Sequence, residues 1–329
     1  MTPTPTTMLP NALNLIRRSE GRLTLGIELP LDNDWSPVRE AQRLAEGRPF
    51  GVPDLSRYVE RVRQVDESGF AALWMRDVPI FDPQRFGDAG SIYDPFVNLG
   101  FLSGVTRNVA LGTAAVVLPF RHPLMVAKAA ASADHLSGGR LILGVASGDR
   151  PVEYPLMGLD FENRGEAFRH SVGWMRDLWQ SKGIPFEGER IAELALLPLP
   201  KQAAIPMVIA GNARQSPDWI AANMNGRFVY PDTPKQLAAK VAGWRRMRGE
   251  LGQDAGVFIS AMHLDLDADP AAPFQPFHFG GRTGRQALIA HLNGLAAAGL
   301  DHLALLLRPS RRSVEEVLDE LARDVLPAL

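Results

Sequence analysis

A regular alternation between short apolar segments and longer amphipathic segments is the strongest constraint on the fold of this chain. Eight segments rich in apolar and β-branched residues predict strands, and a segment with helical spacing of apolar residues follows each one. Strands that alternate with helices pair in parallel. Eight such units favour closure into a (β/α)8 TIM barrel over an open, doubly wound sheet. The expected strands are Leu23–Leu29, Ala72–Arg76, Val109–Leu118, Leu141–Val145, Met207–Ala210, Gly226–Tyr230, Val257–His263 and His302–Leu307.

The intervening segments carry start and stop signals of helices. Ser216 followed by Pro217 is typical of an N-cap followed by the first helical residue. Gly69 stands where the first helix must stop, because glycine adopts the left-handed conformation of a helix end. The expected helices are Leu55–Ser68, Pro95–Gly104, Pro123–Leu136, Gly165–Gln180, Ser216–Asn223, Pro234–Gly249, Gly284–Ala298 and Val314–Leu326.

Three connections are longer than ordinary loops: Pro30–Pro53 after strand 1, Ala146–Arg164 after strand 4, and Ser181–Ile205 between helix 4 and strand 5. Barrel enzymes carry their chemistry on the loops that follow strands, so the first two are expected on the functional face. The third follows a helix and starts on the opposite face, where a hairpin that plugs the barrel bottom is at least as plausible as a functional role. We expect residues 1–20 to form a flexible tail and residues 21–329 a single barrel domain.

Composition excludes several functions. The chain has 35 Lys and Arg against 37 Asp and Glu, a formal charge of −2, which argues against nucleic-acid and membrane-surface partners. It has no cysteine, and its seven histidines form no His-Glu-x-x-His pattern, so no metal is expected. The first residues resemble no secretory signal, and a cytoplasmic location is expected.

Charged residues follow the first two strands and should face the barrel mouth. Glu28 and the pair Arg76 and Asp77 are candidates for catalysis or substrate contact, and structural ion pairs are an equal alternative. His122 is a candidate acid or base, although a histidine that caps the following helix is the simpler interpretation. After strand 7, His263 leads into an aromatic loop around His278 that could close over a ligand.

Two adjacent segments, Leu111–Pro123 and Asp134–Asp149, resemble the third and fourth units of the bacterial luciferase-like flavin family. Arg164 with Glu166–Trp179 resembles the next helix of that family, and Ile209–Ser216 resembles its phosphate-binding segment. The matches fall in the right order on the expected elements and run through most of the chain.

The resemblance implies a set of cofactor contacts. It implies a cis peptide between Ala114 and Ala115 beside the flavin ring, and a turn at Ser147 and Gly148 close to it. An anion at the segment before the fifth helix would meet free backbone N–H groups and Arg214. A competing phosphate site is Gly280–Arg285, after strand 7. The candidate cofactor-binding residues are Ala114, Ala115, Ser147, Gly148, Tyr154, Arg164, Gly211, Asn212, Arg214, Gln215 and Ser216.

By this resemblance the chain is an FMN-dependent oxidoreductase, a two-component monooxygenase that uses reduced FMN and O2 on a small organic substrate. A separate flavin reductase and a homodimer are implied as well. The chain departs from luciferases at Ala146-Ser147, where they carry Cys-Arg, and at Asp77, near which they carry a histidine. An F420-dependent dehydrogenase or reductase, or a non-catalytic flavin-binding relative, therefore remains an alternative.

Overall fold

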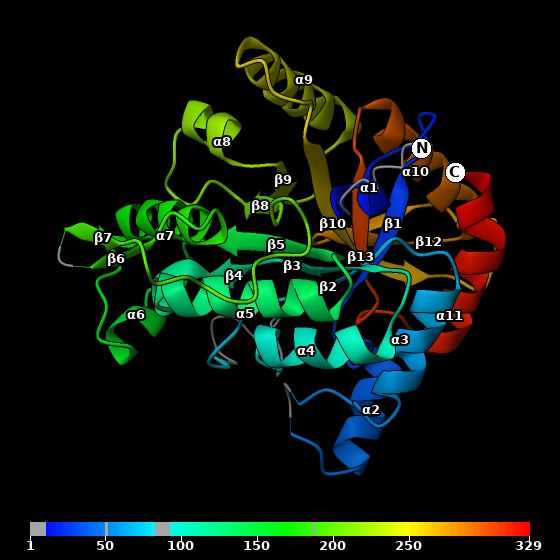
Figure 1. The fold of residues 1–329 in the computed structure, drawn as a ribbon. Helices are drawn as coiled ribbons and strands as arrows, with labels where there is room; N and C mark the ends of the chain where they lie inside the picture. Colours follow the sequence, from blue (N-terminus) through cyan, green and yellow to red (C-terminus); the bar gives the residue numbers. More distant parts are fainter. Residues whose placement is uncertain (1–10, 50–51, 83–92, 187) are drawn as a thin grey trace, which may run out of the picture.

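The computed structural model describes residues 11–49, 52–82, 93–186 and 188–329. Within these residues, eight parallel strands close into a barrel, because β9 pairs with β10 and β13 pairs with β1. The predicted TIM-barrel fold is thus confirmed (Figure 1). The barrel strands are β1 (Thr24–Glu28), β2 (Ala72–Met75), β3 (Ala110–Thr113), β5 (Leu141–Ala146), β8 (Met207–Ala210), β9 (Gly226–Val229), β10 (Val257–Leu266) and β13 (His302–Leu306).

A helix follows each barrel strand and packs outside it (Figure 1). Polar side chains start several of these helices. Ser216, the predicted N-cap, accepts a hydrogen bond from the Trp219 N–H, and Thr233 and Gln236 form a reciprocal capping box that was not predicted. The helices are α3 (Tyr58–Glu67), α4 (Pro95–Val105), α5 (Pro123–Leu136), α7 (Arg164–Trp179), α8 (Pro217–Asn223), α9 (Pro234–Glu250), α10 (Arg285–Ala297) and α11 (Val314–Glu320).

The bottom of the barrel is closed by the short helix α1 (Leu13–Ile16). Leu13 and Ile16 are buried in one apolar cluster with residues that point into the barrel from the strands, among them Trp74. The Ala12 N–H donates to Gln202 Oε1 at 2.7 Å. The expectation of a flexible tail is therefore wrong for residues 12–16, because their apolar side chains fill the lower barrel, while residues 1–10 lie outside the described part.

A buried hydrogen-bond chain crosses the lower barrel next to this helix. Trp74 Nε1–H donates to His302 Nε2 at 2.9 Å, which leaves the proton on Nδ1, 2.8 Å from Thr24 Oγ1. The Thr24 hydroxyl lies 2.8 Å from the Ile16 carbonyl oxygen. Complete burial lowers the pKa of His302 to about 3, so the ring is neutral at ordinary pH.

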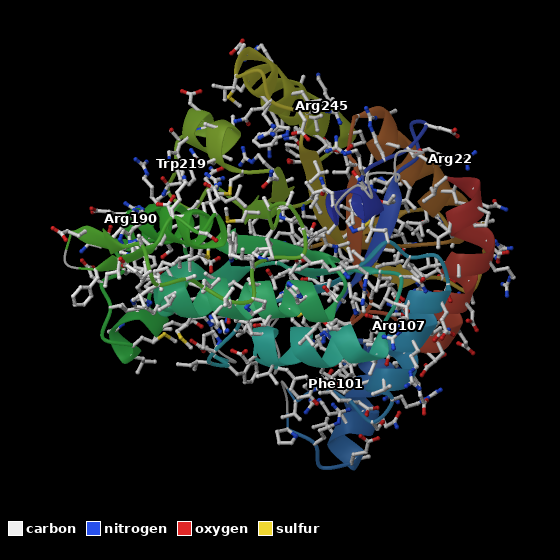
Figure 2. All side chains as sticks on the ribbon, viewed as in Figure 1. Arg22, Phe101, Arg107, Arg190, Trp219 and Arg245 are labelled. Atoms are coloured by element: carbon white, nitrogen blue, oxygen red, sulfur yellow. The ribbon has the colours of Figure 1, made fainter. Side chains whose placement is uncertain are left out.

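The three long connections contain short elements of their own. The first holds α2 (Pro37–Ala45), the second α6 (Glu153–Leu156), and the third an antiparallel hairpin of β6 (Ile184–Phe186) and β7 (Glu189–Ile191). This hairpin extends from the side of the barrel, where Arg190 pairs with Asp177 of α7, so it does not plug the bottom (Figure 2). Helix α1 takes that place instead.

Two further features were not predicted from the sequence. The connection after β10 forms an antiparallel pair, β11 (Gln275–Phe277) and β12 (Gly280–Thr283), and β12 extends the sheet beside β10. The strand expected over Val109–Leu118 is divided into β3 and β4 (Val116–Val117) at a cis peptide.

In the described part of the chain, every helix is too short or too polar to cross a bilayer.

Candidate active site

A cavity of about 560 Å³ opens at the carboxyl end of the barrel strands, where TIM-barrel enzymes hold their ligands. Its wall comes from the ends of β1, β2, β5, β8, β9 and β10 and from the loops that follow them. The wall includes the predicted residues Glu28, Arg76, Asp77, Ala114, Ala115, Ser147, Gly148, Gly211 and Asn212.

Small side chains line much of this cavity. The Ala114–Ala115 peptide is cis, as the resemblance implied, and both residues line the wall. Ala146, Ala210 and Ala261 add three more methyl groups from β5, β8 and β10. Such a surface gives a broad, flat ring close access to the backbone, since no bulky side chain rises from it.

The turn after β5 requires its glycine. Gly148 has a φ of +77°, and a Cβ atom there would lie 2.9 Å from Val117 Cγ1. The Tyr154 hydroxyl donates its proton to the Ser147 carbonyl oxygen, and this hydrogen bond stabilises the turn. Tyr154 is buried between Phe120 and Phe161 and is not among the residues that line the cavity, and its contact with the cofactor stays a prediction.

Arg164 is also placed differently from the prediction. Its guanidinium stacks on the Phe161 ring at 3.4 Å and donates to the Phe161 carbonyl oxygen at 2.5 Å. The side chain thus stabilises the start of α7 outside the cavity wall, and its contact with the cofactor stays a prediction.

The turn between β8 and α8 has an unusual backbone. Gly211, Ala213 and Arg214 all have positive φ, at +63°, +44° and +57°. Within the described residues, the backbone N–H groups of Asn212, Ala213 and Arg214 reach no acceptor. Successive N–H groups in such a turn form a concave site that suits an anion.

Of the side chains around this turn, one can reach a ligand and another is hydrogen-bonded within the protein. Arg214 is about half exposed, and its Nη1 lies 3.5 Å from Glu162 Oε2, so it can reach a ligand at the rim. Gln215 is buried, and both ends of its side-chain amide are hydrogen-bonded. The amide nitrogen donates to the Gly165 and Ala213 carbonyl oxygens, and the amide oxygen accepts two hydrogen bonds from Arg169.

The amide of Gln215 joins the turn to α7, and its contact with the cofactor stays a prediction. Ser216 caps α8 through its hydroxyl and is likewise engaged. Trp219 of α8 packs on Phe168 of α7 outside the barrel and fixes the two helices together (Figure 2).

The competing phosphate site, Gly280–Arg285, is mainly the strand β12 and lies outside the cavity wall.

Both candidate carboxylates at the mouth form ion pairs. Arg76 Nε lies 2.5 Å from Glu28 Oε1, and Glu28 is 3% exposed. Asp77 binds Arg121 with both carboxylate oxygens and accepts the Val117 N–H at 2.9 Å. Burial raises the pKa of Asp77, while Arg121 opposes this effect. These hydrogen bonds of Asp77 stabilise the segment after β3. Glu28 differs, because one of its carboxylate oxygens has no hydrogen bond.

His122 lies outside the cavity wall. It is exposed at the start of α5, where its Nδ1 accepts the Leu124 N–H at 3.2 Å, and its ring packs edge-on against Trp174. The structure thus shows the helix cap that was the alternative interpretation of His122, and its catalytic role stays a prediction.

Sequence reasoning missed several wall residues. Glu153 of α6 is 3% exposed and lines the cavity together with Asp149 and Arg150. Tyr230 and Phe279 stack at 5.1 Å between ring centres. The only signal for Glu153 was its place in the long connection after strand 4, where nothing distinguished it from the other acidic residues.

Comparison with known proteins identifies relatives of this chain. The model of a family described as "Luciferase-like monooxygenase" matches residues 35–291. An uncharacterised protein of Mycobacterium bovis is 27% identical over 229 residues, which cover 65% of this chain and 79% of that protein. The oxygenase component of the flavin-dependent trigonelline monooxygenase of Acinetobacter baylyi is 31% identical over 166 residues, which cover 50% of this chain and 42% of the relative.

Solved structures share the fold at lower identity. The monooxygenase RslO1 from Streptomyces bottropensis superposes with a TM-score of 0.73 at 17% identity and covers 93% of this chain and 99% of its own. An F420-dependent secondary alcohol dehydrogenase, in complex with an F420–acetone adduct, gives a TM-score of 0.71 at 17% identity with the same coverage. At these identities the likeness concerns the barrel, and the chemistry must be argued from the site.

Proposed function

Because this chain belongs to the luciferase-like monooxygenase family and is an oxidoreductase, we propose that it is the oxygenase component of a two-component FMN-dependent monooxygenase. It would use reduced FMN and O2 to oxidise a small organic substrate. The observation that carries this proposal is the combination, at one barrel mouth, of an alanine-lined surface and a turn with three unpaired N–H groups.

The cavity fits the two ends of FMN. The flat, apolar ring suits the surface made by Ala114, Ala115 and the alanines of β5, β8 and β10, where only small side chains rise from the backbone. The phosphate suits the N–H groups of residues 212–214, because a left-handed turn of this kind points its donors at an anion. Arg214 at the rim would add a charged hydrogen bond to the phosphate.

When bound, reduced FMN supplies the electrons and the reactivity toward oxygen, and the protein supplies binding, orientation and exclusion of water. Gly148 keeps the wall open for a close approach of the ring, since any larger residue would meet Val117. Glu28, oriented by Arg76, presents a carboxylate oxygen that can accept a hydrogen bond from a ligand in the cavity.

We also propose two partners. A separate reductase would deliver reduced FMN, as the name of the Acinetobacter relative, an oxygenase component, implies for that protein. A second copy of the chain would pack on α4 and α5, where Val97 is 71% exposed, Met125 63% and Phe101 45% (Figure 2). Sedimentation should then give twice the mass of one chain, and a monomer at all concentrations would exclude this dimer.

The second candidate cofactor is F420, which the similar alcohol dehydrogenase uses on the same fold. At Ala146-Ser147, where the luciferases carry Cys-Arg, the chain has no arginine that could contact a phosphate. The third alternative, a non-catalytic flavin-binding relative, would bind a cofactor without turnover.

A titration with oxidised FMN, reduced FMN and F420, followed by calorimetry, distinguishes these functions. We expect binding of FMN, tighter in the reduced state, and weaker binding of F420. Preference for F420 would replace the proposal with the F420-dependent one, and failure to bind any of the three would remove both. Oxygen-dependent turnover of any substrate with reduced FMN would exclude the non-catalytic alternative.

A further inference from the structure

Two buried carboxylates in the cavity wall each have an oxygen without a hydrogen-bond donor. These atoms, Glu28 Oε2 and Glu153 Oε1, are buried and reach no hydrogen-bond donor among the described residues. Glu28 has its other oxygen bound to Arg76, but no described group donates a hydrogen bond to the Glu153 carboxylate, and Arg150 Nη1 lies 3.9 Å from its Oε1. Buried polar atoms in folded proteins are paired in the large majority of cases, so these oxygens point to a ligand that supplies the missing donors.

The surroundings of Glu153 favour a positively charged ligand. Burial raises the pKa of its carboxyl; Arg150 lowers it, while Asp77 and Asp149 raise it further. The ionised form is therefore costly in the free protein, and a cation bound next to it would remove part of that cost. A neutral donor would satisfy the hydrogen bond without balancing the charge.

The charges of the whole wall agree with this. Four carboxylates line the cavity, from Glu28, Asp77, Asp149 and Glu153, against the two guanidinium groups of Arg76 and Arg150. Arg121, which lies behind the wall, neutralises Asp77. With His263 counted as neutral, the remaining groups carry a formal excess of one negative charge.

Aromatic rings form another part of the same wall. Tyr230 stacks on Phe279 at 5.1 Å and 17°, and His263 meets Phe279 edge-on at 5.8 Å. Phe279 has a φ of +61°, a conformation that costs a non-glycine residue about 1 kcal/mol or more. The faces of such rings attract ammonium groups, and aromatic walls are a recurring device for binding them.

We propose that the substrate of this cavity carries a cationic nitrogen, as an amine or an N-alkylated heterocycle, which the Glu153 carboxylate and the Tyr230–Phe279 wall select. This inference rests on the proposed function, since it assigns the substrate class of that oxygenase. Glu153 acts in it as a specificity-determining residue that contacts the substrate.

Calorimetry with three probes of one shape tests the proposal: benzylammonium, benzyl alcohol and benzoate, on the protein alone and on protein saturated with FMN. We expect benzylammonium to bind about ten-fold tighter than benzyl alcohol, because the ammonium adds the attraction of opposite charges to the hydrogen bond that the alcohol can also donate. Benzoate should be the weakest, because its charge repels the carboxylate. Glu153→Gln should abolish the preference for the ammonium probe. Glu166→Gln, which alters an exposed carboxylate in the first turn of α7, is the matched control and should keep the preference.

The possible results separate the two proposals. FMN binding without any preference for benzylammonium would overturn the substrate class and leave the proposed function standing. Preference for benzylammonium without FMN binding would support the substrate class and remove the FMN proposal. If Glu153→Gln does not fold, Phe279→Leu takes its place, and an unchanged preference in that variant would contradict the role of the aromatic wall.

Discussion

The two ends of the barrel differ in whether their buried polar groups are hydrogen-bonded. At the bottom, the Trp74–His302–Thr24 chain uses both ring nitrogens of the histidine, and Asp134 accepts hydrogen bonds from Lys201 and Gln202. At the mouth, Glu28 and Glu153 each keep a buried oxygen without a donor.

This difference indicates that the residues at the bottom contribute to stability, whereas those at the mouth are arranged to bind a ligand. Satisfied groups at the bottom stabilise the fold, whereas unpaired buried atoms at the mouth cost free energy that a ligand can recover. Changes at the bottom should therefore lower stability without altering cofactor binding, and changes at the mouth should do the reverse. The following predictions test this contrast in order of decreasing effect.

Truncation of the helix that closes the barrel should give the largest loss. Ile16 is fully buried against the lower barrel, so Ile16→Ala should lower the free energy of unfolding by about 2–5 kcal/mol. Urea denaturation measures this, and FMN affinity of the folded variant should not change. Leu15→Ala, on the exposed side of the same helix, is the control, and an equal loss in both variants would contradict the closing role of α1.

Acid should destabilise the bottom of the barrel through His302. Its pKa is about 6.5 in the unfolded chain and about 3 when buried, so the unfolded state binds the extra proton first. The contribution of the neutral ring is complete above pH 6.5 and is lost as the pH falls toward 3. By pH 4 the loss should reach about 3 kcal/mol.

His302→Gln isolates this effect, because glutamine can accept from Trp74 and donate to Thr24 but does not titrate. Urea unfolding at pH 7, 5.5 and 4 should show a shallower loss in the variant than in the parent. Parallel pH profiles would show that the acid sensitivity has another origin.

At the mouth, Arg214→Ala should act on the cofactor. We expect FMN to bind about ten-fold more weakly, because one charged hydrogen bond to the phosphate is removed. Stability should change by less than about 0.5 kcal/mol, since the side chain is half exposed. Arg190→Ala, on the exposed β6–β7 hairpin, serves as control; an unchanged FMN dissociation constant in Arg214→Ala would remove this residue from the phosphate site.

The smallest effect on cofactor binding is expected at Tyr154, which holds the turn after β5 from behind the cavity wall. Tyr154→Phe removes the donor to the Ser147 carbonyl and should lower stability by about 1–2 kcal/mol, with a smaller loss of FMN affinity than in Arg214→Ala. The exposed Tyr93→Phe is the control for denaturation and calorimetry. A larger effect on FMN than on stability would return Tyr154 to the list of direct contacts.

The strands and outer helices could be predicted because their burial follows directly from local periodicity. The range Met207–Ala210 is observed as predicted, and the other barrel strands differ at their ends by a few residues. Helix α1 escaped prediction because four residues are too few to show a helical period, and it is stabilised by contacts with strands far away in the sequence.

The candidate site was predicted in part. Residues on strand ends, such as Glu28 and Ala114, point into the mouth by the geometry of the barrel itself. Residues on long connections were assigned less well, since the sequence does not show whether a polar side chain faces the cavity or a neighbouring carbonyl. Tyr154 and Gln215 face carbonyls, whereas Glu153, which was not selected, faces the cavity.

By itself the sequence determined the barrel, its order of strands and the resemblance to luciferase-like enzymes, because periodic burial and local motifs are properties of neighbouring residues. Only the tertiary structure decided which polar groups are already paired: Asp77 with Arg121, Gln215 with Arg169, and Glu153 without a donor. Hydrogen bonds between distant segments depend on distances of a few tenths of an ångström, and these arise only when the barrel is closed.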